Sequence, residues 1–264
     1  MKHELQGTKI HIATGGREFD AAGRVVVLLH GSGQNHLTWI LQARYLAHRG
    51  FAVLAPDFPG HGLSGGEPLG SIEEMAQWVT DLLDSLGAAK AVLIGHSQGV
   101  LVALEAASRH PERVTSLVLI AGALAIPVND HLITMSQTAP GDAIKMMTSW
   151  GHGPNAHKYD NSMPGHSFLG FGQRVMDMNN ETALLADLKA CNAYSGGGDA
   201  AAAITHPTLC IIAEKDRMTP LKSGKAMAKA IGGAQVQIIK NAGHFLPAET
   251  PFEVNAALSA FLQP

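Results

Sequence analysis

The chain has few cysteines, few aromatic residues and no long hydrophobic run. Its 264 residues include two cysteines, Cys191 and Cys210, which lie apart in runs typical of a helix and a strand. That placement predicts buried thiols, not a disulfide framework. No stretch approaches the roughly 18 consecutive apolar residues of a membrane-spanning helix, and residues 1–7 lack the apolar core of a signal peptide. We therefore expect a soluble, cytoplasmic protein that does not act at a membrane.

The chain also has no large excess of either positive or negative charge. The formal net charge is −3, and 16% of the residues are charged. A chain with this balance has no basic surface to attract nucleic acid or an anionic membrane. The 14 histidines are scattered, without the spacing of a His or Cys/His metal site. We expect a small-molecule partner and no metal.

What the sequence does have is a regular alternation of strand and helix patterns. Apolar runs typical of strands occupy residues 25–29, 51–57, 91–94, 114–120, 207–213 and 234–239. Runs such as 25–29 are continuously apolar, which favours parallel strands buried on both faces. Segments with helical patterning lie between most of them. The alternation predicts an α/β fold with a mostly parallel sheet flanked by helices.

The alternation stops between residues 125 and 205. This segment holds six of the ten methionines, and helical windows are predicted at 142–150, 168–179 and 181–194. Because the strand pattern resumes afterwards, the segment interrupts one domain and does not form a second. We predict an α/β core of residues 1–124 and 206–264 and a helical insertion of residues 125–205.

The central strand leads into a pentapeptide, Gly95-His96-Ser97-Gln98-Gly99, and a small-residue helix follows it. A serine on a sharp strand-to-helix turn adopts a strained backbone conformation and presents its hydroxyl above the sheet edge. The pentapeptide alone is only moderately specific, but the strand before it and the helix after it are the context that a nucleophile elbow needs.

Other polar residues follow the carboxyl ends of further strands, where open α/β sheets bind ligands. Ser32 follows the first long strand, Asp216 the strand that resumes the sheet, and His244 the last strand. Serine needs a base to remove its proton, and histidine, with an ordinary pKa of about 6.5, suits that role near neutral pH. A carboxylate would hold the imidazole in the correct tautomer. Backbone N–H groups of Ser32 and Gln98 are the candidate oxyanion donors.

At this point the chain resembles the α/β-hydrolase superfamily over nearly its whole length. The motifs that carry the resemblance are His30-Gly31-Ser32-Gly33, Asp57-x-x-Gly60-His61-Gly62-x-Ser64, Gly95-His96-Ser97-Gln98-Gly99, Asp216-x-x-x-Pro220 and Gly243-His244-Phe245. The resemblance implies an eight-stranded sheet, a catalytic triad of Ser97, Asp216 and His244, and a helical cap inserted after the sixth strand. Glu214 stands where many members have glycine, so it remains a rival of Asp216 for the acid.

Several residues near these motifs have structural interpretations as well. The resemblance implies that His30 braces the oxyanion loop. His96 is expected to pack or hydrogen-bond beneath the turn, and Asp57 and His61 are expected to fix the loop backbone. Large apolar residues of the insertion are more often core than pocket, but as a group they predict a pliable apolar lining. The candidate substrate-binding residues are Met135, Met146, Trp150, Phe168 and Phe171.

The function that these observations favour is hydrolysis of a small or medium apolar carboxylic ester through an acyl-enzyme on Ser97, with no metal or organic cofactor. One alternative is a hydrolase of C–C bonds in ring-fission products. The other is a non-catalytic small-molecule receptor on the same fold. The sequence is compatible with a monomer or a homodimer.

Overall fold

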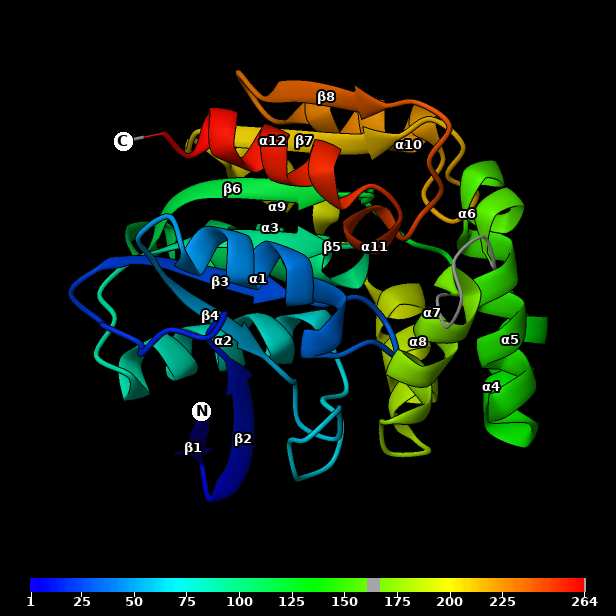
Figure 1. Cartoon of the computed structure of the whole chain (residues 1–264). Helices are drawn as coiled ribbons and strands as arrows, with labels where there is room; N and C mark the ends of the chain where they lie inside the picture. The colour runs from blue at the N-terminus through cyan, green and yellow to red at the C-terminus, as the bar shows by residue number, and fades with distance from the viewer. Residues whose placement is uncertain (161–166, 264) are drawn as a thin grey trace.

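The computed structural model describes residues 1–160 and 167–263. Its centre is an eight-stranded sheet in the order β1-β2-β4-β3-β5-β6-β7-β8 (Figure 1). The strands are β1 (Lys2–Leu5), β2 (Thr8–Ala13), β3 (Arg24–Leu29), β4 (Phe51–Pro56), β5 (Ala91–His96), β6 (Val114–Ile120), β7 (Thr208–Ala213) and β8 (Gln235–Ile239). Strands β3 to β8 pair in parallel, whereas β2 pairs antiparallel with both β1 and β4. The predicted mostly parallel sheet is confirmed.

Helices cover both faces of the sheet. On one face lie α1 (Ile40–Ala47) and α12 (Pro251–Phe261); on the other lie α2 (Ile72–Ser85), α3 (Gln98–Arg109) and α10 (Leu221–Ala230) (Figure 1). Each face has its own apolar core, because the buried side chains of a strand alternate between the two sides. In the central strand β5 every residue is buried, as its continuous apolar run predicts.

Local signals set the helix ends that frame the central strand. The Ser71 hydroxyl accepts the Glu74 N–H at 3.1 Å, which caps the start of α2. Beyond its other end, Gly87 has a φ of 70°, a conformation that glycine adopts without strain. The chain then enters β5, so the elbow that follows is held between two packed elements.

The segment between β6 and β7, where a helical cap is expected from the sequence, is helical, and it is called the cap below. Its helices are α4 (Asp130–Thr138), α5 (Pro140–Gly151), α6 (Pro154–Tyr159), α7 (Phe168–Asp177) and α8 (Ala183–Ala193). They lie beyond the carboxyl ends of the parallel strands (Figure 1). The last helix of the insertion, α9 (Gly197–Ala203), instead packs with α3 against the sheet. None of the helices in the described ranges has the length and hydropathy needed to cross a membrane.

Candidate active site

Ser97 lies on the sharp turn between β5 and α3. Its backbone has φ 54° and ψ −117°, outside the regions that non-glycine residues ordinarily adopt. The flanking glycines make this turn possible, since a Cβ on Gly95 would collide with the Gly99 carbonyl, and one on Gly99 with the Leu29 carbonyl. The helix begins directly at Gln98, so its positive N-terminal end faces the space beside the Ser97 hydroxyl.

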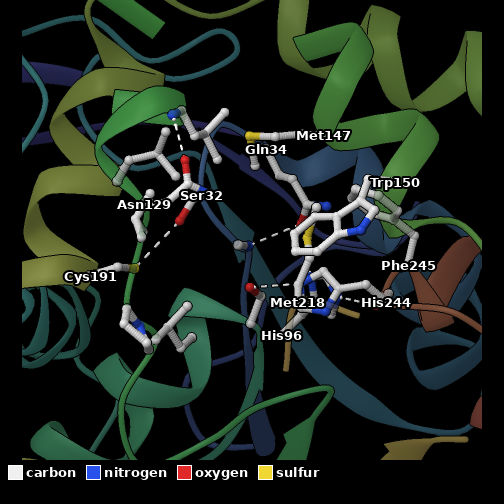
Figure 2. Close-up of a pocket in the computed structure, with 17 residues that line it drawn as sticks. Ser32, Gln34, His96, Asn129, Met147, Trp150, Cys191, Met218, His244 and Phe245 are labelled. Atoms are coloured by element: carbon white, nitrogen blue, oxygen red, sulfur yellow. Dashed lines mark hydrogen bonds between the residues drawn. The ribbon is translucent and has the colours of Figure 1, made fainter. Parts of the chain in front are cut away.

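The three residues predicted from separate strand ends lie in one hydrogen-bonded line. His244 Nε2 is 2.9 Å from Ser97 Oγ, and His244 Nδ1 is 2.9 Å from Asp216 Oδ2; Figure 2 shows His244 among the residues around the pocket. The three residues are nearly enclosed: Ser97, Asp216 and His244 are 8%, 6% and 3% exposed. Each distance is within the range of a direct hydrogen bond, so a proton can pass from Ser97 to His244 without an intervening water.

Asp216 is held as an ionised acceptor. Its Oδ1 accepts the N–H groups of Met218 at 2.8 Å and Thr219 at 2.9 Å, and the Thr219 hydroxyl lies 2.8 Å from Oδ2. Burial opposes ionisation, but His244 and these hydrogen bonds outweigh it and lower the pKa of Asp216. Glu214 points elsewhere: its carboxylate accepts the Asn241 N–H at 3.1 Å and lies 3.7 Å from Lys215 Nζ.

The candidate oxyanion donors are two backbone amides on either side of Ser97. The Ser32 N–H lies in the loop after β3, and the Gln98 N–H opens α3; neither donates to another group within residues 1–160 and 167–263. Below the loop, the Gln34 side chain accepts the Gly31 N–H at 3.1 Å. Two free amides beside a nucleophile are the arrangement that stabilises a developing oxyanion.

Two further buried histidines, His30 and His96, make hydrogen bonds to the loops around Ser97. His30 Nδ1 donates to the Gly31 carbonyl at 3.0 Å, and its Nε2 accepts the Phe58 N–H at 3.2 Å. Burial lowers the pKa of His30 to about 4 and that of His96 to about 3, so both rings are neutral near pH 7. His96 Nε2 lies 2.8 Å from the His244 carbonyl and so supports the loop that carries His244.

A cavity of about 90 Å³ opens onto Ser97 and His244, between the sheet edge and the cap. Of the five cap residues predicted to bind substrate, Trp150 lines it (Figure 2). Met146 borders an adjoining cleft, and Phe168 and Phe171 together line another hollow, which Pro247 also borders. Met135 packs on the apolar core of the cap.

Sequence reasoning missed other residues that line the cavity, including Asn129, Met147, Cys191, Met218 and Phe245. Met218 and Phe245 could have been predicted to line the cavity, because each is close in sequence to a predicted triad member. Cys191 Sγ lies 3.5 Å from the Ser32 hydroxyl, but burial raises its pKa to about 12. A thiol so rarely ionised is no rival nucleophile to Ser97.

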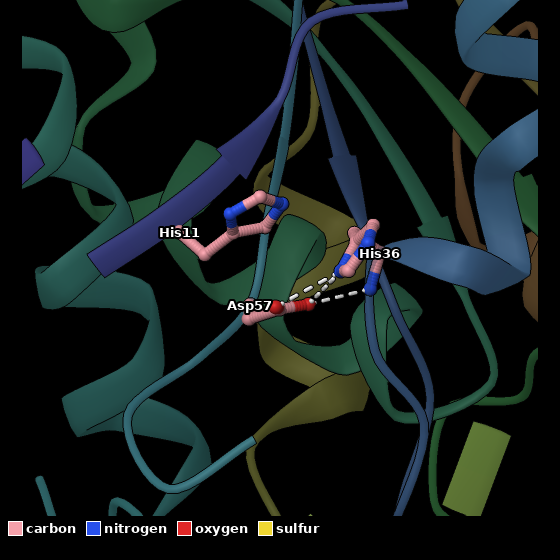
Figure 3. Close-up of side chains that lie close together, drawn as sticks. All are labelled: His11, His36 and Asp57. Atoms are coloured by element: carbon pink, nitrogen blue, oxygen red, sulfur yellow. Dashed lines mark hydrogen bonds and ion pairs between the residues drawn. The ribbon is translucent and has the colours of Figure 1, made fainter. Parts of the chain in front are cut away.

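One other cluster, away from the cavity, has donor groups that suit a metal. Ligand atoms of His11, His36 and Asp57 lie within 4.8 Å of one another (Figure 3). The Asp57 carboxylate already accepts the backbone N–H groups of His36 at 2.6 Å and Leu63 at 2.9 Å, and His36 Nδ1 lies 2.8 Å from Oδ1. A cation would displace the His36 side-chain bond. We therefore assign Asp57 the task of holding the loop after β3 to the glycine-rich loop after β4.

Comparison with known proteins agrees with this architecture. The sequence profile of the Alpha/beta hydrolase family matches residues 26–257. The acetyltransferase component of the acetoin cleaving system of Pseudomonas putida is 31% identical over 245 residues, which are 91% of this chain and 64% of that protein. A 2-hydroxy-6-oxononadienedioate/2-hydroxy-6-oxononatrienedioate hydrolase of Burkholderia vietnamiensis is 28% identical over 258 residues, 90% of this chain and 86% of that protein.

Among solved structures, the enol-lactonase of Burkholderia xenovorans LB400 has a TM-score of 0.89 and 23% identity, with 100% of both chains covered. The chain spans about half to two thirds of the length of the first curated relatives that it matches. The profile match covers most of the chain. This protein belongs to the Alpha/beta hydrolase family.

Proposed function

We propose that this protein is a serine hydrolase that cleaves small or medium apolar carboxylic esters. The observation that carries the proposal is the continuous line Ser97 Oγ, His244 and Asp216, with 2.9 Å at both contacts of the imidazole. A serine, a base within hydrogen-bond reach and a buried carboxylate behind the base are the parts that nucleophilic acyl transfer needs.

In the first half of the reaction, Ser97 Oγ attacks the ester carbonyl carbon while His244 Nε2 takes the hydroxyl proton. The carbonyl oxygen becomes an oxyanion beside the Ser32 and Gln98 amides. When the tetrahedral intermediate collapses, the C–O bond to the alcohol breaks and His244 returns its proton to the departing oxygen. The acyl group is then an ester of Ser97, and the alcohol leaves the cavity.

In the second half, His244 removes a proton from water, and the resulting hydroxide attacks the acyl-enzyme. The bond to Ser97 Oγ breaks, the proton returns to that oxygen, and the carboxylic acid is released. Asp216 holds Nδ1 of the imidazole throughout and stabilises its charged form. These steps use only residues of this chain and water.

The cavity supports an apolar substrate of modest size. Its lining contains no Asp, Glu, Lys or Arg side chain from the described part of the chain, and its cap side is formed by Leu132, Met147, Trp150 and Leu188. A neutral apolar wall favours an alkyl or aryl acyl group over a charged one, because it gives a charge no partner in exchange for lost hydration.

A second candidate is hydrolysis of a C–C bond in a ring-fission product that carries a carboxylate. Arg217 favours it: this exposed residue lines an adjoining cleft of about 480 Å³ that shares Asn129 and Trp150 with the catalytic cavity. A substrate extending into that cleft could place a carboxylate on the guanidinium. The relative from Burkholderia vietnamiensis is named for such a reaction. The neutral lining around Ser97 itself makes the ester the stronger proposal.

Hydrolysis of p-nitrophenyl esters from acetyl to dodecanoyl tests the first candidate, with Ser97→Ala as the matched control. We expect a rate that peaks at one chain length and falls in the variant by several orders of magnitude, on the order of 10⁶. Equal activity in Ser97→Ala would refute the nucleophile. An inactive ester series, together with turnover of a dienoate carboxylate that Arg217→Gln weakens, would favour C–C hydrolysis. Absence of turnover on both substrate classes would favour a receptor.

A further inference from the structure

A buried carboxylate of the cap contacts the oxyanion loop. Asp187 belongs to cap helix α8 and is 1% exposed. Its Oδ2 accepts the Gly33 N–H at 2.7 Å and lies 3.0 Å from Nε2 of His61. Gly33 directly follows Ser32, whose N–H is a candidate oxyanion donor. The cap carboxylate thus holds the peptide next to the one that would bind the oxyanion.

Cap side chains also pack closely against the loop at Gly33. Gly33 has a φ of 64°, and a Cβ there would lie 2.8 Å from Met176 Cε and 2.9 Å from Leu184 Cδ1. The Asn179 side chain also donates to the Gly33 carbonyl at 2.6 Å. Cap groups therefore hold both the N–H and the carbonyl of Gly33.

Asp187 also joins the cap to the glycine-rich loop through His61. The His61 ring is 1% exposed, and its Nδ1 lies 2.9 Å from the Pro59 carbonyl. Burial opposes a charge on either group, but the attraction between them raises the pKa of His61 and lowers that of Asp187. The other carboxylate oxygen, Oδ1, has no hydrogen-bond partner among the described residues.

A buried ion pair with one oxygen unpaired is a costly way to stabilise a fold, and apolar residues of similar volume often serve as well. The cost is consistent with a positional task, because a carboxylate on a rigid helix fixes an amide more tightly than an apolar contact does.

We propose that Asp187 is a positioning residue for the oxyanion hole, and that seating of the cap on the core is what places the Ser32 N–H. The proposal rests on the proposed serine-hydrolase function. Without Asp187 the loop would relax and the Ser32 N–H would move. The transition state, in which negative charge develops on the substrate oxygen, would then be less stabilised, whereas binding of the uncharged substrate would not change.

The variant that tests this is Asp187→Asn, which keeps the shape of the side chain but removes its charge. Asp177→Asn is the matched control, since Asp177 is an exposed acid at the end of neighbouring helix α7. Loss of a whole oxyanion donor costs about 10²–10³ in kcat, so a displaced donor is expected to cost roughly 10–100-fold. KM should change by less than about threefold, because ground-state binding is unaffected.

Two ketone inhibitors separate positioning from a general effect on the pocket. A trifluoromethyl ketone adds to Ser97 and forms an oxyanion, whereas the matched methyl ketone binds without one. We expect Asp187→Asn to weaken binding of the trifluoromethyl ketone by the same factor by which it lowers kcat, and to leave binding of the methyl ketone unchanged. Equal weakening of both, or no change in kcat, would overturn the proposal.

Folding and the proposed function are checked in the same experiment. Circular dichroism and thermal unfolding verify the fold, and Asp187→Ser serves as a second variant if Asp187→Asn does not fold. Failure of both to fold would assign Asp187 a purely structural role and overturn the proposal. Wild-type turnover that Ser97→Ala abolishes keeps the serine-hydrolase function whatever Asp187 does, whereas its absence overturns both.

Discussion

Replacing Asp216 by asparagine should reverse the hydrogen bond on which His244 depends. Oδ1 of Asp216 accepts two backbone N–H groups, from Met218 and Thr219. An asparagine must therefore place its carbonyl oxygen at the Oδ1 position, because an NH₂ group there would face two donors. Its NH₂ then occupies the Oδ2 position, 2.9 Å from His244 Nδ1.

An NH₂ group at that position forces Nδ1 to accept a hydrogen bond and moves the imidazole proton to Nε2. Nε2 then presents a proton to Ser97 Oγ and cannot take one from it. Loss of the correct tautomer costs a serine-protease triad about 10⁴ in kcat, which corresponds to about 5 kcal/mol of transition-state stabilisation. We expect a loss of the same order here, measured as kcat on p-nitrophenyl acetate.

Glu214→Gln is the control, because Glu214 is a nearby acid whose side chain is 34% exposed and turned away from His244. Its activity should stay within about twofold of wild type, as expected for an exposed charge. A loss of less than about tenfold in Asp216→Asn, or a larger loss in Glu214→Gln, would refute the assignment of the acid.

Three further predictions concern the pair Asp187–His61, the elbow and the cap. Because the fold lowers the pKa of Asp187, this carboxylate stabilises the protein fully at pH values above 3.8, its ordinary pKa. Because the fold raises the pKa of His61, this imidazole stabilises the protein fully below pH 6.5, its ordinary pKa, and the stabilisation is lost as the pH rises through the raised pKa. The Tm difference between wild type and Asp187→Asn should therefore be largest between pH 3.8 and pH 6.5. A Tm difference that does not vary with pH would contradict the ion pair between Asp187 and His61. Gly99→Ala should lower the free energy of unfolding by about 1–3 kcal/mol in urea titrations, because its Cβ meets the Leu29 carbonyl, whereas Gly198→Ala, with open space around it, should cost nothing. Trp150→Ala should widen the cavity enough to bury two more methylenes of the acyl chain, which is worth about 1.6 kcal/mol. The ratio of kcat/KM for the octanoyl ester to that for the acetyl ester should therefore rise at least about tenfold. An unchanged ratio would mean that Trp150 does not limit acyl length.

Much of the core could be predicted because its signals are local. Continuous apolar runs give the buried strands β3 and β5, and the glycines on either side of Ser97 are explained by the collisions that a Cβ would cause there. That Ser97, Asp216 and His244 lie close together was predictable because the carboxyl ends of parallel strands meet at one edge of the sheet. The edge strand β1 (Lys2–Leu5) was missed, since four residues with mixed exposure carry no periodic signal.

The cap lining could not be predicted in the same way. Met146 and Met147 are neighbours on α5, about 100° apart around the helix axis; both border the outer cleft, but Met147 also lines the cavity beside Ser97 and Met146 does not. Which face meets the core depends on how α4–α8 pack together, and that packing involves contacts far apart in sequence. Helical windows therefore predict that a cap exists but not which methionine borders the cavity.

Asp187 carried a signal that the sequence analysis did not use. It stands between Leu184 and Cys191 on one face of α8, at the three- and four-residue spacing of a buried stripe. A charged residue within an apolar stripe indicates a buried partner. Its partners, Gly33 and His61, lie more than a hundred residues away, so only the folded chain identifies them.

The most direct test of the account is to identify the residue that reacts with a fluorophosphonate, a reagent for activated serines. After labelling, digestion and tandem mass spectrometry, we predict one adduct on Ser97 that appears in step with loss of esterase activity. It should be absent from Ser97→Ala and form far more slowly in Asp216→Asn. An adduct on another residue, or full inhibition with Ser97 unmodified, would contradict the claim that Ser97 is the nucleophile of this protein.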